Sequence, residues 1–421
     1  KSIIYFTMLT NLIMPRIAAL LTSQWLATVK RFCFELYRKV FVRTHPVTFY
    51  YSCYDPYSHI TAQKLSEFSM YYDIELTIVI VGVTNNIDEQ THIDYALQDC
   101  KRLSQQFQLA DFSEAKVPSK TAIDAANMQL LSNEITIENI IEVGHQLWCH
   151  PDAFSVKHRH VVAAHVAQQL EKSTQRLLAA GHYQSSVFHY GNEWYWSIDR
   201  MPFLANRLKG LGACRHQSKF LTPKAALLSK LPTQPIPIFL SFRSPYSYIA
   251  LCKIKKITEL TGLKFTIKPI LPMVMRGITL SPNKKMNILL DAARVAHHHN
   301  FPFGTIIDPL GDGINDCINL YYYAAQHDKS FQFIDTIMQG IWSQGLDINQ
   351  PLQLQQVVTD LGLDWHEAQQ AMTANVGLQQ AHKNRAQLAD TGLWGVPSFI
   401  VNNDPFWGQE RLDMFLPTTN S

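Results

Sequence analysis

The sequence has no Cys-x-x-C motif, little excess charge and no apolar segment near the roughly 20 residues that cross a membrane. Its seven cysteines lie far apart, at positions 33, 53, 100, 149, 214, 252 and 317. An odd number of dispersed cysteines indicates neither a disulfide framework nor a zinc knuckle. The formal net charge of +3 is well below the concentrated basic surface that nucleic acid requires. We therefore expect a cytoplasmic protein with mostly buried thiols, no metal and no nucleic-acid partner.

The chain does have enough apolar residues for two or three hydrophobic cores, since 47% of its 421 residues are hydrophobic. Residues 1–45 are expected to form an N-terminal amphipathic helical segment. Between Arg16 and Arg43, apolar residues recur at three- and four-residue spacing, and the opposite face is basic. The apolar residues are Leu21, Trp25, Val29, Phe32, Leu36 and Val40, and the basic ones are Lys30, Arg31, Arg38 and Lys39. The pattern is typical of a helix docked on the body of the protein; a weak membrane-surface contact is the alternative.

Internal similarity divides the rest of the chain into two copies. Residues 46–60 match residues 235–249, and residues 181–200 match residues 392–411. Each copy begins with a strand, a helix and a second, parallel strand, continues through a long helical region, and ends in a strand hairpin and a final helix. Prolines between the copies predict a linker. The predicted domains are therefore 46–214 and 235–421, joined by the linker 215–234.

Two motifs of the second copy are candidates for chemistry. Ser244 precedes Pro245 where a strand meets a helix, which is an ordinary N-cap followed by proline in the first turn. Pro397 opens a late strand, where proline is unexpected unless it serves a special backbone geometry. A serine hydroxyl cannot form a disulfide, so dithiol exchange through these positions is excluded.

Together with Phe406-Trp407-Gly408-Gln409-Glu410-Arg411, the motifs Ser244-Pro245-Tyr246-Ser247 and Gly395-Val396-Pro397-Ser398 resemble those of one branch of DsbA-type thioredoxin-fold proteins. This branch contains 2-hydroxychromene-2-carboxylate isomerase and kappa-class glutathione transferase. The resemblance implies an α/β protein of two tandem thioredoxin-like domains, each with a small central mixed sheet and a large helical insertion. It also implies a glutathione-dependent isomerase or transferase-like activity on a small molecule.

The resemblance implies roles for individual residues of the second copy. Ser244 is the expected catalytic residue, because a hydroxyl at a helix N-terminus can stabilise the thiolate of bound glutathione. The backbone beside Pro397 is expected to pair with the extended peptide of glutathione. The expected glutathione-binding residues are Arg243, Tyr246, Ser247, Val396, Pro397, Ser398, Gln409 and Glu410.

The chain also departs from the family pattern. Leu280 stands about where these enzymes usually supply an asparagine, so one polar contact is missing or remade. The nearby cations Arg276, Lys284 and Lys285 could attract a carboxylate, but we interpret them as residues of a solvated loop. His145, Cys149 and His150 lack a fourth zinc ligand and are set aside.

The first copy departs further, so we predict that it is degenerate. Asp55 replaces the serine, and its charge would repel a thiolate. Ser186 replaces the facing proline, and Ser58 and Asp199 complete the counterpart site. Because the enzymes of the resembled branch are typically dimeric, the chain is either a monomer with an internal pseudo-dimer or a homodimer. Two other functions stay open: a non-catalytic peptide-binding or scaffold protein and, less favoured, a thiol-disulfide oxidoreductase.

Overall fold

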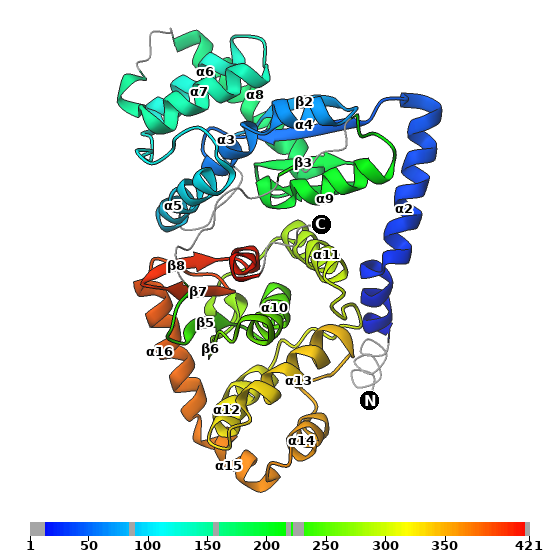
Figure 1. The fold of residues 1–421 in the computed structure, drawn as a ribbon, viewed down its shortest axis with the longest axis vertical. Helices are drawn as coiled ribbons and strands as arrows, with labels where there is room; N and C mark the ends of the chain where they lie inside the picture. The colour runs from blue at the N-terminus through cyan, green and yellow to red at the C-terminus, as the bar shows by residue number, and fades with distance from the viewer. Residues whose placement is uncertain (1–12, 84–88, 155–159, 216–219, 222–230, 417–421) are drawn as a thin grey trace. The chain divides into compact units, whose positions relative to one another are not determined.

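The computed structural model describes residues 13–83, 89–154, 160–215, 220–221 and 231–416 (Figure 1). The chain forms two compact units: the first unit consists of residues 31–229, and the second unit of residues up to 30 together with residues from 230 onward. Most of the predicted linker lies outside the described residues. Within it, Phe220 packs on Phe68 at a ring distance of 5.4 Å, so this part belongs to the core of the first unit. No helix among the described ranges is both long and apolar enough to cross a membrane.

The unit that contains Ser244 is built on a four-stranded mixed sheet of order β6-β5-β7-β8. Its strands are β5 (Ile236–Leu240), β6 (Phe265–Pro269), β7 (Ser398–Val401) and β8 (Asp404–Trp407). β5 and β6 are parallel, and α10 (Pro245–Thr261) is the crossover between them, as predicted. β7 pairs antiparallel with β5 and β8. Alternating apolar residues such as Ile236, Ile238 and Leu240 are buried against the helices.

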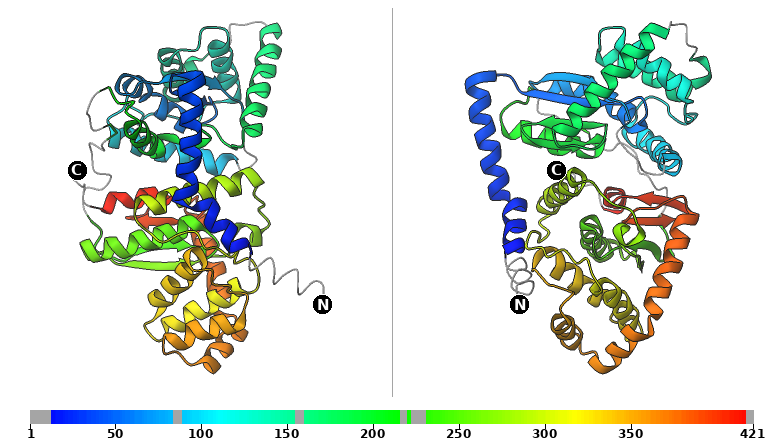
Figure 2. Two further views of the ribbon diagram at one scale, coloured as in Figure 1. Left: turned by 90° about the vertical axis from the view of Figure 1, so that its right-hand side faces the viewer. Right: turned by 180° about the vertical axis from the view of Figure 1, so that it is seen from behind.

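A large helical insertion separates β6 from β7. It contains η3 (Met273–Arg276), α11 (Pro282–His298), α12 (Gly313–Ala325), α13 (Ser330–Ser343), α14 (Pro351–Asp360), α15 (Trp365–Ala374) and α16 (Val376–Asp390). Figures 1 and 2 show α12 to α15 gathered at one end of this unit, with α16 running back to the sheet. The predicted final helix is a 3-10 helix, η4 (Gln409–Phe415), rather than an α-helix.

The other unit has a second four-stranded mixed sheet with the equivalent order, β2-β1-β3-β4. Its strands are β1 (Pro46–Tyr51), β2 (Glu75–Ile80), β3 (Val187–Tyr190) and β4 (Glu193–Trp196), and its helices are α3 (Pro56–Ala62), α4 (Leu65–Tyr71), α5 (Glu89–Phe107), α6 (Lys120–Leu131), α7 (Ile137–Cys149), η2 (Pro151–Ala153), α8 (His160–Ala179) and α9 (Ser197–Gly210). β1 and β2 are parallel, as predicted. The predicted first helix is broken in two at Gln63 and Lys64. The α/β class with two mixed sheets is thus confirmed.

The N-terminal segment is helical but does not dock through its apolar stripe. It consists of a helix over residues 13–22, α2 (Gln24–Tyr37) and a π-helical turn, η1 (Arg38–Val42). Phe32 of the stripe is 67% exposed, whereas Glu35 and Arg38 on the other side are buried. The charged side faces inward because Glu35 accepts hydrogen bonds from Tyr190 Oη at 2.7 Å and Arg38 Nε at 2.6 Å. The interpretation of this apolar stripe as a docking face is wrong.

Candidate functional site

Ser244 caps α10 directly after the buried strand β5. Its Oγ accepts a hydrogen bond from the Ser247 backbone N–H at 3.1 Å, and Pro245 occupies the first turn, where no N–H is needed. The side chain is half-buried, and no acceptor for its own hydroxyl proton is found among the described residues. The N-terminus of a helix carries a partial positive charge. The Ser244 hydroxyl can therefore donate a hydrogen bond to an incoming anion.

The Pro397 loop emerges at the same edge of the sheet. β5 and β7 run antiparallel with Phe239 opposite Ser398, so the end of β5 adjoins the start of β7. The Val396-Pro397 bond is cis, and Pro397 O accepts from Gly408 N at 2.9 Å. Val396 is only half-buried. The loop backbone and the cap of α10 are thus placed together by sheet register.

Three side chains predicted to bind glutathione have internal roles instead. Ser247 is fully buried and its Oγ accepts from Ser241 N at 3.2 Å. Ser398 is equally buried, and its Oγ donates to Gly395 O at 2.8 Å. Gln409 is 1% exposed and its Nε2 donates to Glu410 Oε1 at 2.9 Å. None of these three side chains is open to a ligand in this conformation, because each fastens a neighbouring segment of the site.

Two further predicted binding residues are engaged with the helical insertion. The guanidinium of Arg243 donates two hydrogen bonds to the carboxylate of Asp308, both at 2.6 Å, and these raise the pKa of Arg243. Tyr246 Oη donates to Asp291 Oδ2 at 2.8 Å. These contacts tie the start of α10 to α11 and to the loop after it.

Arg276 is part of the site wall rather than of a solvated loop. Its Nη1 and Nη2 donate to the carbonyl oxygen of Trp394 at 3.3 and 3.2 Å, immediately before Gly395. Burial lowers the pKa of Arg276, and it also lowers the pKa of Lys284 at the start of α11. The interpretation of Arg276 as a freely solvated cation is wrong, because the Pro397 loop holds it.

Glu410 is one of the predicted glutathione-binding residues. It is half-buried and lies three residues after the end of β8, in η4. Gly408 has φ +100°, and a Cβ at this position would lie 2.5 Å from Glu410 Oε2. The positive φ favours glycine at this position, whereas the flexible Glu410 side chain could move away from an added Cβ. The turn places Gly408 directly against the Glu410 carboxylate.

In the first copy, Asp55 occupies the position of Ser244 and accepts hydrogen bonds from three donors of the same unit. It accepts from Tyr57 N at 3.0 Å, from Ser185 Oγ at 2.8 Å and from Ser58 Oγ at 3.4 Å. Burial outweighs these hydrogen bonds and raises the pKa of Asp55 from 3.8 to about 6. An ionised carboxylate has no proton to donate to a thiolate, and its charge would repel one.

The hydroxyl that meets Asp55 belongs to Ser185, not to Ser186 as we expected from the alignment with Pro397. Ser186 has φ 55° and its Oγ lies 3.2 Å from Thr61 Oγ1 inside the unit. Its carbonyl oxygen nevertheless accepts from Ser197 N at 2.6 Å, the same bond that Pro397 makes to Gly408. Asp199 is half-buried in the first turn of α9. The loops at Ser186 and Pro397 thus share this backbone hydrogen bond, but different side chains face the two helix caps.

The sequence comparison missed a further pair of equivalent contacts. Tyr57 Oη donates to Asp99 Oδ2 at 2.7 Å, matching the bond from Tyr246 to Asp291. Both aspartates lie in the first helix of an insertion and are followed three residues later by arginine, at 102 and 294. A search for the short Asp-x-x-Arg pattern at similar offsets would have found them.

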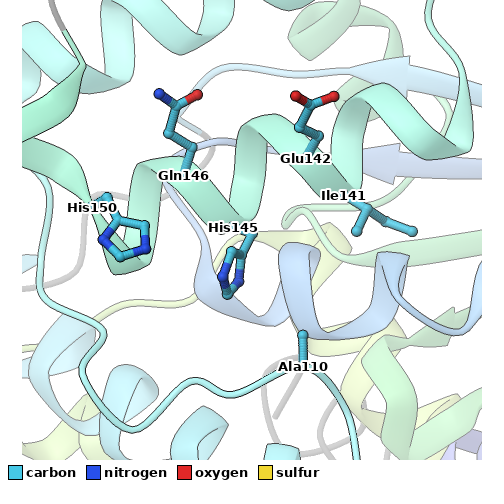
Figure 3. Close-up of a pocket in the computed structure, with 6 residues that line it drawn as sticks. All are labelled: Ala110, Ile141, Glu142, His145, Gln146 and His150. Atoms are coloured by element: carbon cyan, nitrogen blue, oxygen red, sulfur yellow. The ribbon is translucent and has the colours of Figure 1, made fainter.

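A separate surface hollow of about 650 Å³ lies along α7, lined by Ala110, Ile141, Glu142, His145, Gln146 and His150 (Figure 3). Cys149 Sγ is 3.6 Å from His145 Nδ1, but burial raises the pKa of Cys149 to about 11, so the thiol is protonated. Across the described ranges, no three His, Cys, Asp or Glu side chains are grouped to hold a metal ion. Cys53 is fully buried, and burial raises its pKa far above the ordinary value.

Comparison with known proteins identifies the part of the chain that carries Ser244. The model of the DSBA-like thioredoxin domain matches residues 235–418. The 2-hydroxychromene-2-carboxylate isomerase of Sphingobium xenophagum is 26% identical over 189 residues, covering 43% of this chain and 95% of that protein. The Pseudomonas putida protein of the same name is 20% identical over 187 residues, covering 42% and 91%. A solved structure of 2-hydroxychromene-2-carboxylate isomerase aligns with a TM-score of 0.38 and 18% identity, covering 43% of this chain and 92% of that one. Residues 235–418 are thus a DSBA-like thioredoxin domain homologous to 2-hydroxychromene-2-carboxylate isomerase.

Proposed function

We propose that residues 235–418 bind glutathione and use its thiolate in an isomerase or transferase-like reaction on a small molecule. The observation that carries the proposal is the free hydroxyl proton of Ser244. The oxygen already accepts from Ser247 N at 3.1 Å, which polarises the O–H bond toward an external acceptor. A hydrogen bond to the charged form of a thiol lowers its pKa.

The remaining groups fit an extended peptide with two carboxylates and one ammonium group, such as glutathione. The half-buried backbone at Val396 offers strand-like pairing. Arg276, held at Trp394 O, places a positive charge beside that loop. Glu410 places a carboxylate near the end of β8, where an ammonium group would be favoured. The peptide-binding ends and the thiol-binding hydroxyl therefore lie along one edge of the domain.

A stabilised thiolate is a nucleophile that adds to an electrophilic carbon of the substrate. If the sulfur leaves again after a bond rotation or proton shift, the product is an isomer and glutathione is regenerated. If the sulfur stays, the substrate takes up a proton from water at the atom that received the electron pair, the product is a conjugate, and one glutathione is consumed for each turnover. The homology to named isomerases favours the first course.

We also propose that residues 46–214 are a second, degenerate thioredoxin-like domain that serves as an internal partner. The equal strand orders support it. So do the bonds from Ser52 N to Ser58 Oγ at 3.1 Å and from Ser241 N to Ser247 Oγ at 3.2 Å, which stand at matching positions. The carboxyl of Asp55, which accepts hydrogen bonds within its own unit, supports the loss of activity in this copy.

Calorimetry with glutathione on the intact chain and on Ser244→Ala tests the binding proposal. The expected result is binding by the intact chain and about 10- to 100-fold weaker binding by the variant, as for a lost hydrogen bond to a charged group. Ser119→Ala is the matched control, because Ser119 caps α6 through the same kind of bond, to Ala122 N at 3.2 Å. Absence of glutathione binding by the intact chain would refute the proposal; peptide binding without it would favour a scaffold role.

A further inference from the structure

The continuous helix of α2 and η1 presents an apolar face to solvent. We call this face the outer stripe; it consists of Trp25, Val29, Phe32, Leu36 and Val40, of which Trp25 is 66%, Phe32 67% and Val40 59% exposed. At about 100° per residue, the first four of these side chains fall within about 60° of one another. Monomeric soluble proteins rarely leave a contiguous apolar surface of this kind uncovered.

The outer stripe cannot turn inward, because the opposite side of the helix is fixed by charge. Arg31 Nε and Nη2 donate to the carboxylate of Glu193 at 2.7 and 3.0 Å. Glu35 is buried and bonded to both Tyr190 Oη and Arg38 Nε. Rotation would break the bonds that Glu35 and Arg31 make to Tyr190 and Glu193 outside the helix and carry the pair of Glu35 and Arg38 out of its buried position.

The charges left on the solvent side are all positive. Lys30, Lys39 and Arg43 are exposed and have no ion-pair partner among the described residues. Glu35, which is buried, is the one acidic residue between positions 13 and 45. By helical periodicity, Lys39 lies about 50° from the centre of the outer stripe, close to Phe32, whereas Lys30 lies about 130° from that centre, away from the stripe. An apolar face with a basic side chain beside it complements a surface that is anionic outside and apolar beneath.

We propose that the outer stripe binds the surface of an anionic lipid membrane, with the helix lying in the plane of the interface. Trp25 and Phe32 enter the boundary between headgroups and acyl chains, and Lys39 contacts lipid phosphates. The inference is independent of the chemistry at Ser244.

Co-sedimentation of the full chain with vesicles tests the proposal. We expect binding to vesicles of phosphatidylcholine and phosphatidylglycerol in a three-to-one ratio, little binding to phosphatidylcholine alone, and release by salt. The double variant Phe32→Ser/Leu36→Ser should bind at least about tenfold more weakly. Lys39→Gln should bind about fivefold more weakly.

Matched controls are available elsewhere in the chain. Leu352→Ser removes a leucine that is 78% exposed on α14, and Lys383→Gln removes an exposed lysine on α16. Both should bind like the unaltered chain. Failure of the intact chain to bind anionic vesicles, or unchanged binding by Phe32→Ser/Leu36→Ser, would overturn the proposal. So would a dimer in sedimentation velocity that this variant dissociates, since a second copy would then cover the stripe.

Discussion

The junctions from β1 to α3 and from β5 to α10 share a frame and differ in the residue that caps the helix. In both, a buried serine in the first helical turn accepts from the end of the preceding strand, at 3.1 Å for Ser58 and 3.2 Å for Ser247. In both, a tyrosine beside this serine bonds an aspartate of the helical insertion. The cap is Asp55 in one and Ser244 in the other.

The difference shows how one substitution can close a site. Asp55 brings its own negative charge to the helix N-terminus, and three donors of the same unit satisfy it. Ser244 accepts one bond and keeps its proton for an external partner. Both residues cap their helices, and we propose that only Ser244 also binds an anion.

The substitution Ser244→Asp breaks the comparison most directly, because it gives the second unit the cap of the first. A carboxylate about 4 Å from a thiolate is repelled by on the order of 4 kcal/mol, so glutathione affinity should fall at least about a hundredfold. Calorimetry measures the change. Asp55→Ser is the reciprocal variant. It should create no second glutathione site, because the facing loop carries Ser186 in place of proline. Binding of a second equivalent of glutathione would show that the residue capping the helix is by itself sufficient for binding.

Asp55→Asn tests whether the carboxyl group strains the first unit. Because burial raises the pKa of Asp55 to about 6, the folded state holds its proton more tightly than the unfolded state does. The stabilisation is present at acid pH and is lost as the pH rises from about 4 toward 7. The neutral variant should be more stable at neutral pH by about 1–3 kcal/mol, allowing for partial exposure. Denaturant unfolding at pH 5 and pH 7.5 measures it; a variant less stable at both would contradict the assignment.

Gly144→Ala tests whether the first unit supports rather than performs the chemistry. A Cβ at this position on α7 would lie 2.5 Å from His59 Nδ1 and 2.7 Å from Tyr51 Oη, so the variant should lose about 1–3 kcal/mol of stability. Gly210→Ala is the control, since nothing lies within 4 Å of its Cβ. Glutathione binding should persist in both variants below their melting temperatures. Loss of glutathione binding by folded Gly144→Ala would indicate that the binding site lies in the unit of residues 31–229, contrary to the proposal.

Arg276→Gln should have the smallest effect. The variant keeps a donor for Trp394 O but removes the positive charge beside the Pro397 loop, so affinity for the doubly carboxylated peptide should drop about fivefold. Lys383→Gln, on the solvent side of α16, is the charge-matched control. If Arg276 attracts glutathione electrostatically, the affinity of the intact chain should fall more steeply with salt concentration than the affinity of Arg276→Gln. Equal glutathione affinities of the two proteins would contradict this role.

The sequence predicted those features that depend on repeated local patterns. The β-branched and aromatic runs at β1 and β5, with a proline-started helix after each, predicted the parallel pairs that the structure has. It also predicted the Ser244 cap, because serine followed by proline has one usual backbone geometry at such a junction.

Features that depend on side-chain direction could not be predicted. The positive φ of Ser186 turns its hydroxyl inward and leaves Ser185 to reach Asp55. The outer stripe of α2 faces solvent because the buried pair of Glu35 and Arg38 outweighs it. Periodicity identifies the two faces of a helix but does not determine which one packs when the polar face has buried charged partners.

The central claim is that the Ser244 hydroxyl lowers the pKa of a bound thiol, and a titration of that thiol tests it most directly. The ultraviolet absorbance of the thiolate would be followed against pH for glutathione saturated with the intact chain and with Ser244→Ala. The account predicts a thiol pKa at least about one unit below the ordinary value near 8.5 in the complex with the intact chain, and no such depression with the variant. The same pKa in both complexes would contradict it.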